Sequence, residues 1–219
     1  MCSSGSLATL ASNAADALLD GRAHVEPNFL SDDALAASRA DMSSALAQIA
    51  QGQGKDLDDF ESIQTDLLDP DFRRQLPTPY PFSGLLGQID ALRTALAQST
   101  GRALLDGGGF HLMRYASGSK FMRHVDEDPA MEDAVRNSIS FLIYLTDPSW
   151  STDDGGALRL YERGGEEDAP RLVVPAGGTL VLYDSTMEHE VDTTRRERHL
   201  ISGRFRELHQ DWQSYRDVG

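Results

Sequence analysis

Three of the six histidines in this chain begin a triplet in which an acidic residue follows two positions later. They are His24-Val25-Glu26, His124-Val125-Asp126 and His209-Gln210-Asp211. Because side chains at positions i and i+2 of a strand project from the same face, such a triplet can direct an imidazole and a carboxylate at one metal ion. A chain with 35 acidic residues also produces the triplet by chance, so its surroundings must decide.

The surroundings favour His124 and Asp126, which end a segment expected to be a strand at residues 121–126. His24 lies in a helical region, and His209 lies in a polar tail. Neither has the neighbouring strands that would bring further ligands to it. We therefore interpret these two triplets as surface or structural pairs.

A third candidate ligand, His189, lies in a later expected strand at residues 188–192. Two imidazoles and one carboxylate leave open coordination positions, which non-haem Fe(II) needs to bind a chelating cosubstrate and oxygen together. A closed structural zinc site would fill its coordination sphere and usually use cysteine, but the only cysteine is Cys2. The pattern therefore predicts an iron site made of His124, Asp126 and His189.

Arg198 opens the last expected strand, nine residues after His189. A buried guanidinium is costly unless a carboxylate meets it, and its planar fork matches carboxylate oxygens. If Arg198 points inward with Leu200 and Ser202, it can anchor the far carboxylate of 2-oxoglutarate while the other end chelates iron. The nearby arginines at positions 195 and 196 are expected to be solvated turn residues.

The segments that must position these residues change character near residue 100. Before it, Ala and Leu recur at helical spacing in three segments, at residues 7–18, 35–49 and 85–96. Ser31 and Ser83 are expected helix starts. The stretch 55–81 carries seven acids between positions 56 and 71, and it is expected to be a long loop with a few turns.

After residue 100 the pattern shortens to eight expected strands bounded by Gly, Pro and Asp. They are residues 110–115, 121–126, 138–145, 157–161, 171–174, 179–183, 188–192 and 198–206. Short strands after a helical front half indicate a jelly-roll or other antiparallel barrel braced by helices. The predicted fold class is mainly β with supporting helices.

A length of 219 residues suits one compact domain. We expect residues 1–219 to form it, with helical support at 1–101 that includes the acidic loop, a catalytic core at 102–207 and a tail at 208–219. With a lone cysteine, no signal-peptide pattern and no membrane-spanning apolar run, the chain is expected to be cytoplasmic. The oligomeric state stays open.

The formal net charge is −15. A chain this acidic should repel phosphate backbones and anionic membranes, so neither nucleic acid nor a membrane is expected as a partner. Acidic stretches fall between the expected strands, where loops usually surround a barrel site. One hypothesis is that they steer a basic peptide to the iron, and the alternative is that the charge serves solubility alone.

Several ordered motifs resemble the prolyl 4-hydroxylase family of Fe(II)/2-oxoglutarate-dependent oxygenases, closest to its oxygen-sensing branch. The motifs cover about half of the chain and include Phe110-His111-Leu112-Met113-Arg114-Tyr115, Arg123-His124-Val125-Asp126, Ile143-Tyr144-Leu145, Gly155-Gly156-Ala157-Leu158-Arg159-Leu160, Pro175-Ala176-Gly177, and His189-Glu190-Val191 with Arg198. In the front half, a short strand and a helix opening with Phe29-Leu30-Ser31 are also similar to that branch. The resemblance implies a double-stranded β-helix, which is a jelly-roll core.

The resemblance also implies the site and its reaction. Iron would be bound by the three predicted ligands, and 2-oxoglutarate by Arg198 and by the hydroxyl of Tyr144. Tyr115 corresponds to a family tyrosine near the substrate side and is grouped with the cosubstrate pocket. With O2 as a further cosubstrate, and with ascorbate as a possible reductant, such a dioxygenase hydroxylates a C–H bond and releases succinate and CO2. The aspartate at position 126 favours hydroxylation, because related halogenases lack it.

Arg204 departs from the family pattern, in which a bulky aromatic residue is expected six positions after the anchoring arginine. It shares a face with Arg198 by strand parity. Arg204 is either a substrate-binding residue that meets a carboxylate or an ion-paired residue of the rim. The expected substrate is a prolyl residue in a protein or peptide. The alternatives are a free amino acid or other small metabolite and, in another class, an inactive metal-binding barrel that serves as a binding module.

Overall fold

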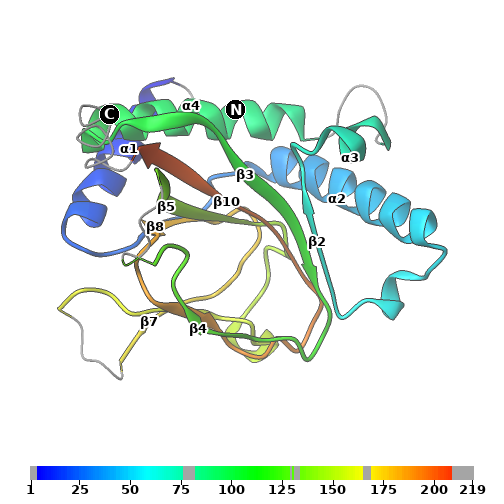
Figure 1. Ribbon diagram of the computed structural model, residues 1–219. Helices are drawn as coiled ribbons and strands as arrows, with labels where there is room; N and C mark the ends of the chain where they lie inside the picture. The colour runs from blue at the N-terminus through cyan, green and yellow to red at the C-terminus, as the bar shows by residue number, and fades with distance from the viewer. Residues whose placement is uncertain (1–3, 76–81, 129, 131–133, 165–168, 209–219) are drawn as a thin grey trace.

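The computed structural model describes residues 4–75, 82–128, 130, 134–164 and 169–208 (Figure 1). Its strands form two antiparallel sheets. The larger sheet has the order β1-β8-β5-β10-β3-β2, and the smaller has the order β4-β9-β6-β7. The strands are β1 (His24–Glu26), β2 (Ser62–Asp66), β3 (Leu104–Tyr115), β4 (Phe121–His124), β5 (Val135–Tyr144), β6 (Leu158–Leu160), β7 (Arg171–Val173), β8 (Leu180–Asp184), β9 (His189–Val191) and β10 (Arg198–Leu208).

The helices gather on the outer face of the larger sheet, and the smaller sheet lies on the other side (Figure 1). They are α1 (Ser4–Leu19), α2 (Asp32–Gln53), α3 (Pro70–Gln75) and α4 (Ser83–Thr100), with 3-10 turns at Leu57–Asp59 and Thr152–Asp154. Ser31 caps α2 as predicted, since its hydroxyl accepts a hydrogen bond from the Ala34 amide at 3.3 Å. Ser83 begins α4, but Phe82 precedes it as a cap residue that makes no side-chain hydrogen bond.

Alternation along β10 divides the buried side chains between two cores. Ile201 and Phe205 join the cluster between the larger sheet and the helices. Leu200 joins a second cluster between the two sheets, together with the inner residues of β6 and β8. The even-numbered residues of β10 from 198 to 204 therefore face the interior of the barrel, and a register shift after Phe205 ends this alternation. This is the fold class that the sequence predicts.

Three sequence expectations were wrong in detail. The acidic stretch is not only a loop, because residues 62–66 form β2 and pair with β3 through Gln64↔Met113 and Asp66↔His111. Strand β3 starts six residues earlier than expected, at Leu104. Strand β4 ends at His124, so Asp126 lies beyond it. The tail with His209, the residues 76–81 and parts of two acidic loops lie outside the described residues.

Among the described residues, no helix combines the length and the apolar character that are needed to cross a bilayer.

Candidate active site

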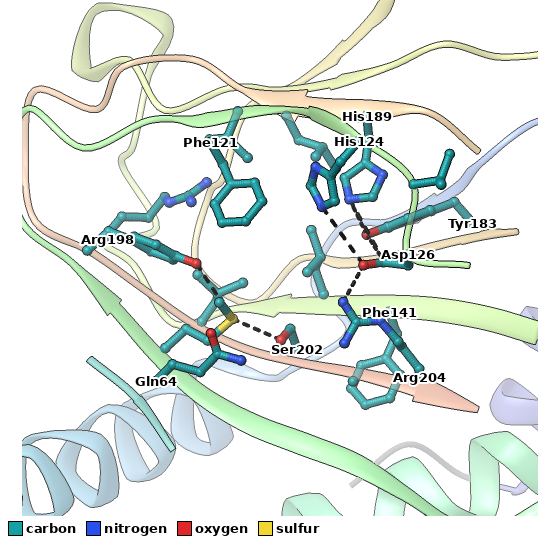
Figure 2. Close-up of a pocket in the computed structure, with 18 residues that line it drawn as sticks. Gln64, Phe121, His124, Asp126, Phe141, Tyr183, His189, Arg198, Ser202 and Arg204 are labelled. Carbon is teal, nitrogen blue, oxygen red and sulfur yellow. Dashed lines mark hydrogen bonds and ion pairs between the residues drawn. The ribbon is translucent and has the colours of Figure 1, made fainter. Parts of the chain in front are cut away.

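The three predicted ligands meet inside the barrel (Figure 2). A carboxylate oxygen of Asp126 lies 3.9 Å from Nε2 of His124, and the other lies 3.8 Å from Nε2 of His189. The two imidazole rings have their centroids 4.2 Å apart. One ligand atom from each residue falls within 4.8 Å of the others, which makes the cluster a candidate metal site. Antiparallel pairing produces it, since His124 and His189 are register partners in β4 and β9.

Both imidazoles are held in the same way. Nδ1 of His124 lies 2.8 Å from the carbonyl oxygen of Met122, and Nδ1 of His189 lies 3.0 Å from that of Met187. A hydrogen bond from Nδ1–H to a carbonyl fixes the tautomer that leaves the Nε2 lone pair free for a metal. Burial lowers the pKa of His189, which keeps this ring neutral at neutral pH.

The carboxylate of Asp126 is surrounded by donors. Ser140 Oγ donates to Oδ2 at 2.7 Å, Tyr183 OH donates to Oδ2 at 3.1 Å, and Arg204 Nη2 is bonded to Oδ1. Burial acts to raise the pKa of Asp126, but Arg204, His189 and Ser140 together outweigh it and hold the pKa below its usual value. The group is therefore an anion at neutral pH.

The backbone explains why Asp126 reaches the site from beyond its strand. The amides of Asp126 and Glu127 both donate to the Ser185 carbonyl at 2.9 Å. This anchor on the segment that follows β8 replaces the strand geometry expected at residues 125–126. The face shared by His124 and Asp126 was thus predicted correctly, although an intervening bend rather than strand alternation creates it.

Tyr183 is a site residue that the sequence reasoning missed. Its ring is fully buried, and its hydroxyl lies 3.1 Å from Asp126 Oδ2 and 3.2 Å from His189 Nε2. Burial, reinforced by the charge of Asp126, raises its pKa well above the ordinary value, so the hydroxyl remains a donor. The available signal was parity, because Tyr183 shares the inner face of β8 with Val181.

The opposite end of the cavity contains Arg198, which is 4% exposed. Its Nη1 donates to the Gly156 carbonyl at 3.3 Å, while its Nε and the hydroxyl of Tyr144 are buried without a hydrogen-bond partner among the described residues. Burial raises the pKa of Tyr144 to about 12, although the positive charge of Arg198 opposes this shift. Buried donors that lack partners are costly unless a ligand satisfies them, and a carboxylate suits both.

Tyr115 belongs to this same end. The guanidinium carbon of Arg198 lies 4.9 Å from the centroid of the Tyr115 ring, a cation-π arrangement. The Tyr115 hydroxyl makes a 3.9 Å contact with the sulfur of Met113. The cation-π contact places Tyr115 beside the predicted cosubstrate anchor.

Gly155 and Gly156 have a structural role beside Arg198. Both adopt positive φ, at 69° and 70°, which favours glycine. A Cβ on Gly155 would lie 2.3 Å from the Thr193 carbonyl oxygen. The turn that results brings the Gly156 carbonyl to Arg198.

One cavity of about 290 Å³ is lined by the cluster of His124, Asp126 and His189 and by Arg198 and Arg204. Gln64 reaches it from β2, which the sequence did not predict as a strand (Figure 2). The remaining lining is largely apolar and includes Met113, Phe121, Phe141, Leu142, Leu158, Val191 and Leu200. Of the other triplets, His24 lies on β1, with Nε2 3.2 Å from Glu26 and outside this cavity.

Comparison with known proteins agrees with this geometry. Residues 110–206 match the family model of the 2OG-Fe(II) oxygenase superfamily. A PKHD-type hydroxylase of Caulobacter vibrioides is 33% identical over 93 residues, which cover 41% of this chain and 38% of the relative. A PKHD-type hydroxylase of Picosynechococcus sp. is 32% identical over 116 residues, covering 52% and 47%. The matched stretch thus spans less than half of each relative, and the family model matches less than half of this chain.

Solved structures share the fold. A prolyl-4-hydroxylase of Pseudomonas putida superposes with a TM-score of 0.70 at 24% identity, over 91% of this chain and 100% of that one. A prolyl hydroxylase of Trichoplax adhaerens, in complex with a hypoxia inducible factor peptide fragment, gives 0.67 at 18% identity over 91% and 90%. A non-heme alpha ketoglutarate dependent carbocyclase from nogalamycin biosynthesis gives 0.60 at 16% identity over 93% and 89%. The double-stranded β-helix is therefore established, but it hosts more than one reaction.

Proposed function

We propose that this protein is an Fe(II)- and 2-oxoglutarate-dependent dioxygenase that hydroxylates a C–H bond, with a prolyl residue of a protein or peptide as its substrate. One observation carries the proposal: a cavity that joins a cluster of two histidines and a carboxylate to Arg198. A metal-binding module would need the cluster but not the unpartnered donors at the other end.

The residues fit both absent groups. Two Nε2 atoms and one carboxylate match the facial ligand set of non-haem Fe(II), and His124, Asp126 and His189 would hold it. Arg198 and Tyr144 would hold the distal carboxylate of 2-oxoglutarate. When bound, these groups and O2 supply oxidative decarboxylation of 2-oxoglutarate to succinate and CO2, with one oxygen atom passing to the substrate carbon.

The side chains and backbone around the site orient the proposed ligands and limit the access of water. Ser140 and Tyr183 fix the plane of the Asp126 carboxylate, and the carbonyls of Met122 and Met187 fix the imidazole rings. The apolar lining limits water around the reacting groups.

The prolyl assignment rests on what the relatives and fold neighbours are described as, namely PKHD-type and prolyl hydroxylases. A second candidate, a free amino acid or another small metabolite, is favoured by Arg204, which lines the cavity as a second cation. The cavity is also at the small end of the range for ligand sites.

Succinate release in the presence of Fe(II) and 2-oxoglutarate tests the oxygenase. Mass spectrometry for the gain of one oxygen atom, first on proline-containing peptides and then on amino acids, tests the substrate. Assays with and without ascorbate test whether a reductant is needed. Metal binding without succinate release would favour the binding module, and failure to bind metal would contradict both interpretations.

A further inference from the structure

Arg204 lies at the end of the cavity that faces away from Arg198 (Figure 2). Its side chain is 34% exposed and bonded to Asp126, whereas Arg198 is 4% exposed, donates to the Gly156 carbonyl and lies against the Tyr115 ring. Solvent therefore reaches the Arg204 guanidinium more readily than that of Arg198. The more exposed arginine is therefore on the side from which a substrate arrives.

Arg198 and Arg204 are too far apart to bind the same carboxylate of 2-oxoglutarate. They are six positions apart on β10, so their Cα atoms are separated by roughly 20 Å at the usual rise of about 3.3 Å per residue. Figure 2 shows Arg204 beside Asp126 and Arg198 across the cavity from both. The cavity thus has two separate anion-binding positions, and the one at Arg204 adjoins the cluster.

The charged side chains that line the cavity do not balance when iron and 2-oxoglutarate are bound. Among the described residues, the lining carries two arginines and one carboxylate, and no lysine or glutamate. A divalent cation and doubly charged 2-oxoglutarate cancel each other, so a loaded cavity keeps one excess positive charge. An anionic group on the substrate would neutralise it.

Arg204 also has donors to spare. Asp126 is its partner in the described part of the chain, and its Nε is buried without any partner. A guanidinium carries several N–H donors in a fixed fork that can engage a second carboxylate. Asp126 itself keeps Ser140 and Tyr183 as donors if Arg204 turns partly away.

We infer that Arg204 is a specificity-determining residue that binds a carboxylate of the substrate, on the oxidised residue or the one next to it. The inference rests on the proposed function, because it assumes a substrate beside the metal. The carboxylate is close to the reacting carbon because Arg204 directly contacts a proposed ligand. It belongs either to a free amino acid or to an acidic neighbour within a peptide.

The test uses the full chain loaded with Mn(II) and 2-oxoglutarate, in which paramagnetic broadening of probe proton signals reports binding without turnover. Probes are the L-amino acids against their amides and, in a second arm, N-acetyl tripeptides with a central proline followed by Asp or Asn. We expect wild-type protein to prefer the carboxylate form at least about tenfold in one arm, which identifies its source.

The variants separate recognition from folding. Arg204→Gln should abolish the preference and Arg204→Lys should retain part of it, since lysine keeps the charge but loses the fork. Arg206→Gln, at an exposed position on the same strand, should leave the preference intact. No carboxylate preference in either arm, or a preference that survives Arg204→Gln, overturns the inference. Failure of Mn(II) or 2-oxoglutarate to bind in the first step overturns the proposed function instead.

Discussion

Arg198 and Arg204 project from one strand into one cavity, yet their surroundings differ. Arg198 is enclosed by Tyr115, Tyr144 and the Gly155-Gly156 turn, and no described residue pairs it with a carboxylate. Arg204 is partly open and already paired with Asp126. A buried cation without a partner is stabilised strongly by one anion that fits beside it, whereas an exposed and paired cation can exchange partners. This difference supports the proposal that the Arg198 end binds the cosubstrate and the Arg204 end meets the substrate.

The largest expected effect removes the centre that both ends share. His189→Ala should weaken Mn(II) binding by about 100-fold or more and abolish succinate release, because it deletes a ligand. Isothermal titration and a succinate assay measure the two effects. His24→Ala is the matched control from another triplet and should change neither. Wild-type metal affinity in the His189 variant would contradict the ligand assignment.

Arg198→Met and Arg204→Met should move the stability of the metal-free protein in opposite directions. Replacing the uncompensated Arg198 should raise the unfolding free energy by about 1 kcal/mol, and replacing Arg204 should lower it by a similar amount because Asp126 loses a partner. Urea unfolding with chelator present measures both. Equal signs for the two variants would remove the distinction between the ends.

The same Arg198→Met variant should raise the 2-oxoglutarate concentration needed for half-maximal succinate release by roughly 10- to 100-fold, since a charge-assisted pair is lost. The Arg204→Met variant should leave this requirement within about threefold of wild type. An unchanged requirement in the Arg198 variant would move the anchor elsewhere.

Tyr144→Phe should raise the same 2-oxoglutarate requirement by about tenfold, because a hydrogen bond to a charged carboxylate is lost. Tyr115→Phe is the comparison, because its hydroxyl contacts only a sulfur in the described structure. A larger effect at Tyr115 than at Tyr144 would exchange their roles.

A smaller, pH-dependent effect on stability is expected at Asp184, which does not line the cavity. Burial would raise its pKa, but hydrogen bonds from Thr186 and Arg102 outweigh burial and hold the pKa below its ordinary value. Such a group stabilises the fold above about pH 4 and loses that contribution as pH falls through the lowered pKa. Asp184→Asn should therefore cost about 1 kcal/mol at pH 6 and nearly nothing near pH 2, as measured by urea unfolding. A cost that is independent of pH would assign it to packing.

The sequence predicted the position of a site residue where that residue lies next to an apolar segment that forms a strand. The convergence of His124, Asp126 and His189 and the burial of Arg198 could be predicted, because His124, His189 and Arg198 each lie at the end or the start of a strand. Gln64 could not, because β2 has one buried apolar residue, Ile63, and forms on the open edge of β3 rather than by its own propensity. The partners of Tyr183 and Arg204 depend on side chains from distant segments, so only the assembled barrel reveals them.

The triplet His24-Val25-Glu26, which joins no candidate metal site in the described structure, forms strand β1 at the edge of the larger sheet. Strand β1 is three residues long and covers the outer edge of β8, whose residues 180–183 are buried. Bare edges of apolar strands invite pairing between molecules, and short strands with charged residues blunt that tendency. His24 and Glu26 thus make the end of the sheet a poor template for a second chain. A chain that begins at residue 28 would lose both α1 and β1, would expose the edge of β8 and part of the helical core, and should self-associate increasingly with concentration.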